Sequence, residues 1–231
     1  MARINKSALT KLEIVQESSK QILQKGYTAA SITGISKALG MSPGNLTFYY
    51  PTKEHLLAEL VDLLCGFQWK RMEQEADEGI SSVLAICLEL TSMTSACESD
   101  PVIKDFFLSA YSSPMCLEII RRNDTERAKK VFGAYCPDWT DEQFSEAEIL
   151  CSGIEYATLM TANDPVSLET RISGALNHIL SIYGIPEEMR QTKIKKVFAM
   201  DYRNLGKRVL REFREYVEQT NEQALLDLLN R

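Results

Sequence analysis

Histidine is scarce in this sequence, and its cysteines are scattered. Of 231 residues, two are histidines and six are cysteines. The cysteines are Cys65, Cys87, Cys97, Cys116, Cys136 and Cys151, and no two have the C-x-x-C spacing of a metal or redox site. Two histidines leave little material for a zinc site or a catalytic triad. We therefore expect no metal, no cofactor and no enzymatic activity. The thiols are expected to be reduced and buried, with one redox-sensing cysteine as the alternative.

The sequence also lacks long hydrophobic runs. No segment is apolar enough to span a bilayer, and residues 1–11 lack the apolar core of a secretory signal. Strand-like alternation is almost absent, and there is no repeat or low-complexity stretch. With 45% hydrophobic and 25% charged residues, the composition is that of a soluble globular protein. We expect a cytoplasmic protein with no membrane partner.

Acidic residues outnumber basic ones, but unevenly along the chain. The net charge is −6, yet residues 1–56 hold seven basic and three acidic residues, whereas the remainder holds 19 basic and 29 acidic ones. A basic end on an acidic body would orient the molecule on nucleic acid. The imbalance is modest and does not by itself identify a DNA-binding protein.

The most informative segment is residues 31–53. Apolar or small side chains recur there at helical spacing, at Ile32, Ile35, Ser36 and Leu39. Gly40 would end this helix in a left-handed conformation, and Ser42 would cap a second helix with Pro43 in its first turn. The pattern predicts two short helices joined by a tight turn, which is a helix-turn-helix.

The second of these helices has an outward face with little packing duty. Helical spacing directs Leu46 and Tyr50 towards the core. The outward residues are Gly44, Asn45, Thr47 and Phe48. A helix this slim can enter the major groove of DNA. There, Asn45 could offer a donor and an acceptor to adenine, and Thr47 could contact a polar base edge or a thymine methyl.

These features resemble the TetR-type transcriptional regulators over residues 20–57. The resemblance rests on Gly26-Tyr27 after a first helix, on Ser31-Ile32, on the Gly40-Met41-Ser42 turn, on Gly44, Leu46 and Tyr49-Tyr50, and on Pro51-Thr52-Lys53-Glu54 before Leu56-Leu57. At Ser36, Thr47 and Phe48 the sequence differs from what is common in the family. Together with the helical periodicity, the resemblance implies an all-α protein. A three-helix N-terminal helix-turn-helix domain would be joined by a long helix to a C-terminal helical bundle.

The resemblance also implies which residues meet DNA. Phosphates would be met by the helix N-termini at Ser31, Ser42 and Thr52. Lys53 and the Tyr49 hydroxyl would add to them, although Tyr49 could equally belong to the core. The full set expected to contact DNA is Ser31, Thr33, Ser42, Pro43, Gly44, Asn45, Thr47, Phe48, Tyr49 and Lys53. The expected target is double-stranded DNA with a palindromic operator, bound by a homodimer.

Helical periodicity continues to the end of the chain. After a helix over 7–25 and the two helices just described, helices are predicted from 52 to the low seventies and over 80–98, 101–110, 115–122, 124–135, 140–161, 166–183, 187–218 with a bend near 201, and 221–230. The predicted domains are 1–52, which binds DNA, and 53–231, which binds ligand and dimerises. The second includes a C-terminal helical extension from about residue 184.

By resemblance, two late helices would pair with their copies in a dimer. The candidates are 140–161 and 166–183. Their apolar stripes are Ile149, Ile154 and Leu159 in the first and Leu168, Ile172, Leu176 and Ile179 in the second. These stripes could equally form core within one chain.

The resemblance further implies a ligand pocket inside the bundle. The candidate lining residues, which could each be plain core instead, are Trp69, Met93, Phe107, Tyr111, Tyr135 and Glu155. A buried Glu155 would favour a cationic or hydrogen-bonding effector.

Two hypotheses for function remain. One is a dimeric repressor that a small-molecule effector releases from an inverted-repeat operator. The other is a TetR-fold DNA-binding adaptor that responds to a protein partner. The stretch 190–214, with nine basic and two acidic residues, is expected to be a solvated or salt-bridged face of the distal domain. An extra DNA contact or a partner site are the alternatives.

Overall fold

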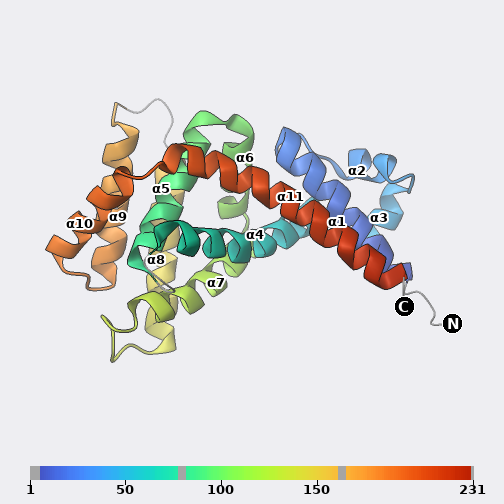
Figure 1. Ribbon diagram of the computed structural model, residues 1–231. Helices are drawn as coiled ribbons and strands as arrows, with labels where there is room; N and C mark the ends of the chain where they lie inside the picture. The colour runs from blue at the N-terminus through green and yellow to red at the C-terminus, as the bar shows by residue number, and fades with distance from the viewer. Residues whose placement is uncertain (1–5, 78–81, 161–164, 230–231) are drawn as a thin grey trace.

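The structure is a computed structural model that describes residues 6–77, 82–160 and 165–229. Over these ranges the chain forms eleven α-helices and no strand (Figure 1). The prediction of an all-α protein that begins with a helix-turn-helix is therefore confirmed. None of the described helices has the length and hydropathy that crossing a membrane requires. The predicted helix start at 80, helix end at 161 and chain break at 163–164 lie outside the described residues.

The first three helices enclose a small core. They are α1 (Lys6–Lys25), α2 (Ile32–Ala38) and α3 (Pro43–Tyr49), and α4 (Lys53–Ala76) follows them. The buried side chains of this core are Ile14, Val15, Ile35, Leu46, Tyr50 and Leu56. The predicted inward orientation of Leu46 and Tyr50 is confirmed. Because Leu56 comes from α4, the start of that helix is anchored to the helix-turn-helix by packing.

Helix α4 leads from this small core into the main one, where Leu57, Leu60 and Leu64 are buried. Thr52 occupies the N-cap of α4, as predicted. Its hydroxyl, however, bonds the His55 ring at 2.8 Å rather than a backbone N–H.

Six further helices build the bundle around the distal part of α4 (Figure 1). They are α5 (Val83–Ser99), α6 (Pro101–Ser112), α7 (Pro114–Phe132), α8 (Asp141–Met160), α9 (Leu168–Ile182) and α10 (Glu187–Phe198). Helix α5 is buried on almost every side, because its residues are mostly apolar or small. The helices predicted over 115–122 and 124–135 are one continuous helix, which ends at Phe132. Helix α7 continues through Asn123, whose side chain donates to the Ile119 carbonyl at 2.9 Å.

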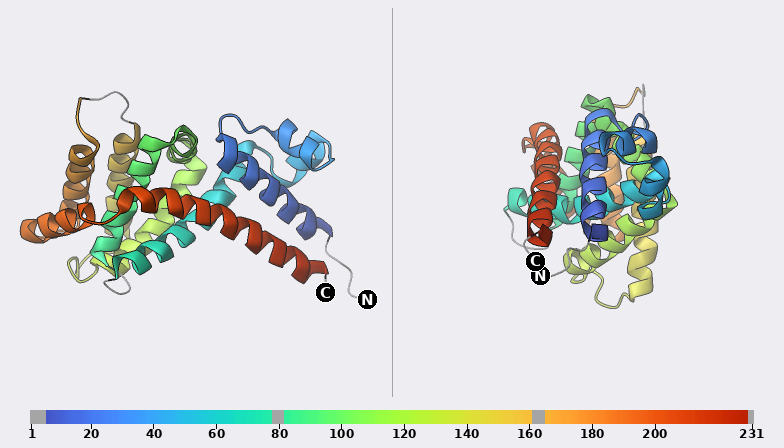
Figure 2. Two further views of the ribbon diagram at one scale, coloured as in Figure 1. Left: turned by 45° about the horizontal axis from the view of Figure 1, so that its top comes forward. Right: turned by 90° about the vertical axis from the view of Figure 1, so that its right-hand side faces the viewer.

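The last helix leaves the bundle. Instead of one bent helix over 187–218 and a short helix over 221–230, α10 ends at Phe198 and α11 (Tyr202–Leu229) begins after a break. Helix α11 runs back antiparallel to α1, so that the end of α11 lies near the start of α1 (Figures 1 and 2).

An apolar stripe explains this course of α11. Its buried members recur every four residues, at Leu205, Val209, Phe213 and Val217. Arg208 pairs with Glu75 of α4 at 2.5 Å, and Glu212 pairs with Arg71 at 2.7 Å. The expectation that residues 190–214 belong to a distal face is therefore wrong for their second half. Lys207 and Arg211 line a groove together with Leu23 and Gln24 of α1.

Candidate DNA-binding surface and bundle cavity

The turn between α2 and α3 has the capping geometry that the sequence predicts. The Ser31 hydroxyl accepts from the Gly34 N–H at 3.0 Å and caps α2. The Ser42 hydroxyl accepts from the Asn45 N–H at 3.2 Å and caps α3. Gly40 has φ +66°, a left-handed conformation that side chains disfavour. These local bonds hold α3 at a defined angle to α2.

The outward face of α3 is open to solvent. Gly44 and Asn45 are exposed, and Phe48 is 80% exposed, the largest value among the exposed large hydrophobic residues. Thr47 is half-buried and its hydroxyl donates to the Gly44 carbonyl at 3.2 Å. Ser31, Thr33, Ser42 and Pro43 are exposed as well. An exposed Phe48 adds nothing to the core, so this face is suited to contact another molecule.

Tyr49 lies at the edge of this surface. Its ring is half-buried against the small core and meets the Phe48 ring edge-on, with 5.3 Å between centroids. Within the described part of the chain its hydroxyl has no hydrogen-bond partner. The Tyr49 ring thus packs against the core while its hydroxyl stays available to a phosphate. Tyr49 can therefore be both a core residue and a phosphate contact.

Lys53 has internal partners that the sequence did not indicate. Its Nζ donates to the carbonyls of Tyr27 at 2.9 Å and Ala30 at 3.0 Å, and it lies 4.1 Å from the centroid of the Tyr27 ring. Desolvation lowers the pKa of the Lys53 ammonium. Lys53 therefore ties the start of α4 to the loop before α2, and a phosphate would have to share this ammonium with two carbonyls.

Two side chains from other helices connect the bundle to the helix-turn-helix. Asp105 of α6 accepts from the Thr28 N–H at 2.8 Å and also from the Thr28 hydroxyl. Glu54 of α4 accepts from the Ser113 hydroxyl at the junction of α6 and α7. Neither contact could be predicted from the sequence, because the partners are 77 and 59 residues apart. A displacement of α6 would therefore also move the loop before α2.

A cavity of about 70 Å³ lies inside the bundle. Residues from α4, α5, α6, α7, α8 and α9 line it, and its walls are mostly apolar and aromatic. The polar residues of the lining are Gln68, Glu89, Tyr111, Asp124, Arg127, Glu148, Glu155 and Tyr183. Four carboxyl groups in one cavity are unusual, because burial penalises each charge.

Arg127 neutralises part of this group. Its guanidinium pairs with Glu89, lies 3.4 Å from Asp124 and stacks on the Trp69 ring at 4.5 Å from the centroid. The carboxylates of Glu89 and Asp124 keep the pKa of Arg127 above its ordinary value, so it stays charged. Burial raises the pKa of Asp124 to about 6, against the opposing effect of Arg127.

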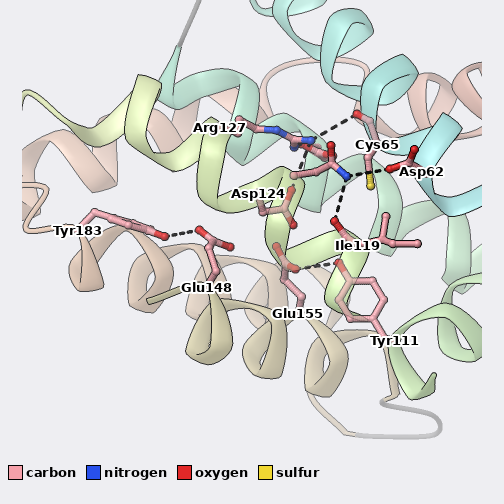
Figure 3. Close-up of polar contacts among 11 residues, drawn as sticks. Asp62, Cys65, Tyr111, Ile119, Asp124, Arg127, Glu148, Glu155 and Tyr183 are labelled. Carbon is pink, nitrogen blue, oxygen red and sulfur yellow. Dashed lines mark hydrogen bonds and ion pairs between the residues drawn. The ribbon is translucent and has the colours of Figure 1, made fainter. Parts of the chain in front are cut away.

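The other two carboxyl groups have tyrosine partners instead of a cation. Glu148 and Glu155 lie seven residues apart on one face of α8 (Figure 3). The Tyr183 hydroxyl donates to Glu148, and the Tyr111 hydroxyl donates to Glu155 at 2.8 Å. Burial raises the pKa of Glu148 to about 8 and that of Glu155 well above its ordinary range. Glu148 therefore holds a proton at neutral pH, and burial favours the protonated form of Glu155 as well.

Comparison with known protein families identifies the family of the N-terminal part. The family model of bacterial regulatory proteins, tetR family, matches residues 14–60, from the middle of α1 into the first half of α4. Residues 14–60 belong to the TetR family. The resemblance to the TetR-type transcriptional regulators over residues 20–57 is thus confirmed. The match covers the TetR domain alone, and among curated proteins none matches the chain.

Solved structures with a related course of the chain are more distant. Salmonella enterica GusR shares 19% identity over 76% of this chain and 94% of its own, with a TM-score of 0.44. A gamma-butyrolactone receptor, described as an ArpA-like protein, shares 17% identity over 89% of this chain and 99% of its own, with a TM-score of 0.40. At these scores the likeness carries no inference about ligand or mechanism.

Beyond the TetR domain, the structure brings together four of the six residues expected at a ligand pocket. Met93, Phe107, Tyr111 and Glu155 line the cavity. Trp69 does not line it but stacks on Arg127 from behind. Tyr135 is 38% exposed, and its hydroxyl lies 3.3 Å from the Met189 sulfur.

Sequence reasoning missed most of the charged lining. Asp124, Arg127 and Glu148 stand in segments whose charges are typical of a solvated helix face, whereas Glu89 is the one charged residue in the apolar stretch 83–97. One signal was present: Glu148 precedes Glu155 by two helical turns and so shares its face.

Proposed function

We propose that the chain is a homodimeric repressor of the TetR family, released from an inverted-repeat operator by a small molecule in the bundle cavity. The observation that carries the DNA-binding part is the exposed face of α3, where Asn45 and Phe48 make no contribution to the core. Asn45 and Thr47 would read base edges in the major groove. Ser31, Ser42 and Tyr49 would hold phosphates beside it.

The division of labour is proposed at residue 52. Residues 1–52 would bind DNA, and 53–231 would bind the effector and dimerise. Two separate groups of buried side chains support this boundary, one around α1–α3 and one in the bundle. Helix α11 complicates the division, because it belongs to the second part and packs along the first.

The proposed dimer interface is the open face of α8. Ile149 and Leu150 are 52% and 54% exposed there, and Met160 is 47% exposed. Of the stripe expected on this helix only Ile149 is exposed, because Leu159 is buried in the main core and Ile154 packs against it. The apolar stripe of α9, in contrast, is buried within the chain: Leu168, Ile172, Leu176 and Ile179 all belong to the main core. Pairing of two α8 helices would cover the exposed apolar residues.

The proposed release mechanism runs through α6 and α4. Phe107 and Tyr111 of α6 line the cavity, and Asp105 of the same helix holds the Thr28 loop. A ligand that displaces Phe107 or Tyr111 would move Asp105 and change the orientation of α3. Helix α4 would transmit the same displacement, because its apolar residues reach both cores.

A binding selection from random duplex DNA tests the DNA-binding part. With the full-length chain we expect enrichment of an inverted repeat. Enrichment of no sequence, or of a single half-site without symmetry, would contradict the proposal.

The second candidate function, a DNA-binding adaptor that answers to a protein partner, is favoured by the cavity size. About 70 Å³ is below the roughly 300–1,000 Å³ of typical ligand pockets. The repressor proposal therefore needs a compact effector or an expansion of the cavity. A purified system that contains the chain, its operator and small molecules but no second protein distinguishes the two functions. Release from the operator there supports the repressor and contradicts the adaptor.

A further inference from the structure

The cavity has an excess of acidic groups. Its charged lining residues are Glu89, Asp124, Arg127, Glu148 and Glu155. Arg127 is already paired with Glu89 and Asp124. Glu148 and Glu155 are left facing the cavity with tyrosine hydroxyls as their hydrogen-bond partners and no cation. A second positive charge beside Glu148 and Glu155 would favour their ionised forms, whereas an anion would disfavour them.

Gln68 points independently to a ligand. It comes from α4, lines the cavity and is 5% exposed. Nothing in the described part of the chain forms a hydrogen bond with its side-chain amide. Buried amides are normally paired, so an unpaired one at a cavity wall marks a place for a polar group from outside the chain. Its carbonyl oxygen can accept a hydrogen bond from an ammonium group.

The remaining walls suit the carbon skeleton of an organic ion. Phe107, Phe132 and the rings of Tyr111 and Tyr183 surround the acidic groups, and Met93 adds a polarisable side chain. Aromatic faces attract cations, as the stack of Arg127 on Trp69 shows beside the cavity. Nowhere in the described chain do three or more His, Cys, Asp or Glu residues form a group that could hold a metal ion. The lining thus suits an organic cation better than a metal ion.

We propose that the effector is a compact organic ammonium ion, bound between the carboxyl groups of Glu148 and Glu155 with the Gln68 carbonyl as a third acceptor. This inference rests on the proposed function, because it names the chemical class of the effector. The volume of about 70 Å³ has room for a few water-sized groups, which limits the ion to a short carbon skeleton.

Ammonium binding should release protons. In the empty cavity burial raises the pKa of Glu148 to about 8, and Glu155 is raised as well. The groups that face these two carboxyls are Glu89 from α5, Tyr111 from α6, Asp124 and Arg127 from α7, Cys151 from α8 and Tyr183 after α9. Of these only Arg127 is positive, and it does not offset burial. An ammonium ion favours the ionised carboxylate, so its affinity should rise as the pH rises towards 8.

Calorimetry on the full-length protein tests the inference. The probes are n-butylammonium and tetramethylammonium, with butan-1-ol and butyrate as neutral and anionic controls. We expect at least one ammonium ion to bind, with an affinity about tenfold higher near pH 8.5 than near pH 6.5 and with proton release that shows in buffers of different ionisation enthalpy. The two controls should not bind.

Variants locate the site. Glu155→Gln and Glu148→Gln should each weaken ammonium binding by about tenfold or more and reduce the pH dependence. Burial favours the protonated, uncharged form of both carboxyl groups, so the neutral amide should leave the fold intact at neutral pH. Circular dichroism and Tm report on this. Glu146→Gln changes an exposed carboxylate of the same helix and should leave binding unchanged. Gln68→Met removes the proposed third acceptor without changing a charge, and it should also weaken ammonium binding.

The outcomes separate this inference from the proposed function. If neither ammonium ion binds at either pH, or if the Glu variants bind as well as the unaltered chain, the inference is wrong. If butan-1-ol or butyrate instead binds and weakens operator binding, the result supports the repressor function and contradicts only the proposed class of effector. Ammonium binding that leaves operator affinity unchanged would support the cavity site and contradict effector control.

Discussion

At the scale of single residues, Asn45 is the side chain whose loss should separate base choice from overall affinity. Asn45 is exposed, and only its backbone takes part in a cap. We expect Asn45→Ala to lose about 1–3 kcal/mol of discrimination at one base pair per half-site, with an unchanged Tm. Titration of the selected operator and its single-base variants measures this.

Ser42→Ala is the contrast to Asn45→Ala: it removes a cap, costs about 1 kcal/mol of stability and should weaken binding to every sequence. An unchanged base preference would show that Asn45 does not read DNA.

The residues around Asn45 were predictable because their signals are local. Ser31 and Ser42 cap helices a few residues away, and Gly40 provides the left-handed turn. Gln68 and Glu148 were not predictable. Their role depends on which helices enclose the cavity, and a polar residue at one helical position does not indicate burial.

Glu148 should make stability depend on pH. Its folded-state pKa of about 8 lies above the ordinary 4.5. Between these values the unfolded chain releases the proton while the folded chain keeps it, so stability falls as the pH rises from about 5 to 8. Glu148→Gln cannot ionise and should lessen that fall, on the order of a few kcal/mol at most. Urea unfolding across this pH range measures it, with Glu146→Gln as the control. Parallel curves for Glu148→Gln and the unaltered chain would mean that Glu148 is ionised in the folded state.

At the scale of elements, the packing of α11 on α5 depends on Gly206. A Cβ at this position would lie 2.2 Å from the Ser92 carbonyl oxygen and 3.1 Å from the Ala96 Cβ. We expect Gly206→Ala to force the helices apart and to destabilise the fold by about 1–3 kcal/mol. Gly66→Ala is the matched control on α4, with nothing within 4 Å, and should stabilise by roughly 0.5–1 kcal/mol. Urea unfolding and limited proteolysis compare the two. Equal stability of both variants would contradict the close contact of α11 with α5.

The elements themselves were only partly predictable. Most helix positions followed from periodicity, and Gly184, with φ +67°, follows α9 where a stop was predicted. The break expected between 218 and 221 is absent: α11 is continuous there, and Asn221 is buried. The path of α11 along α1 was not predictable either. An amphipathic stripe shows that a helix is buried on one side but not which partner covers it.

At the scale of the whole molecule, the cavity and the TetR domain are mechanically connected. Helices α4, α6 and α11 each contact both the bundle and the N-terminal helices. A change at the cavity therefore has three routes to α3, of which the sequence indicated only α4. The strength of this connection decides whether a small cavity can control DNA binding.

The central claim is that two chains place their α3 helices on the two halves of one inverted repeat. Sedimentation velocity of the full-length chain on the selected duplex, with hydroxyl-radical footprinting of the same complex, tests it directly. We predict two chains per duplex and two symmetric protected patches, with centres about 34 Å apart or a multiple of that distance. One chain per duplex with a single protected patch would contradict the claim.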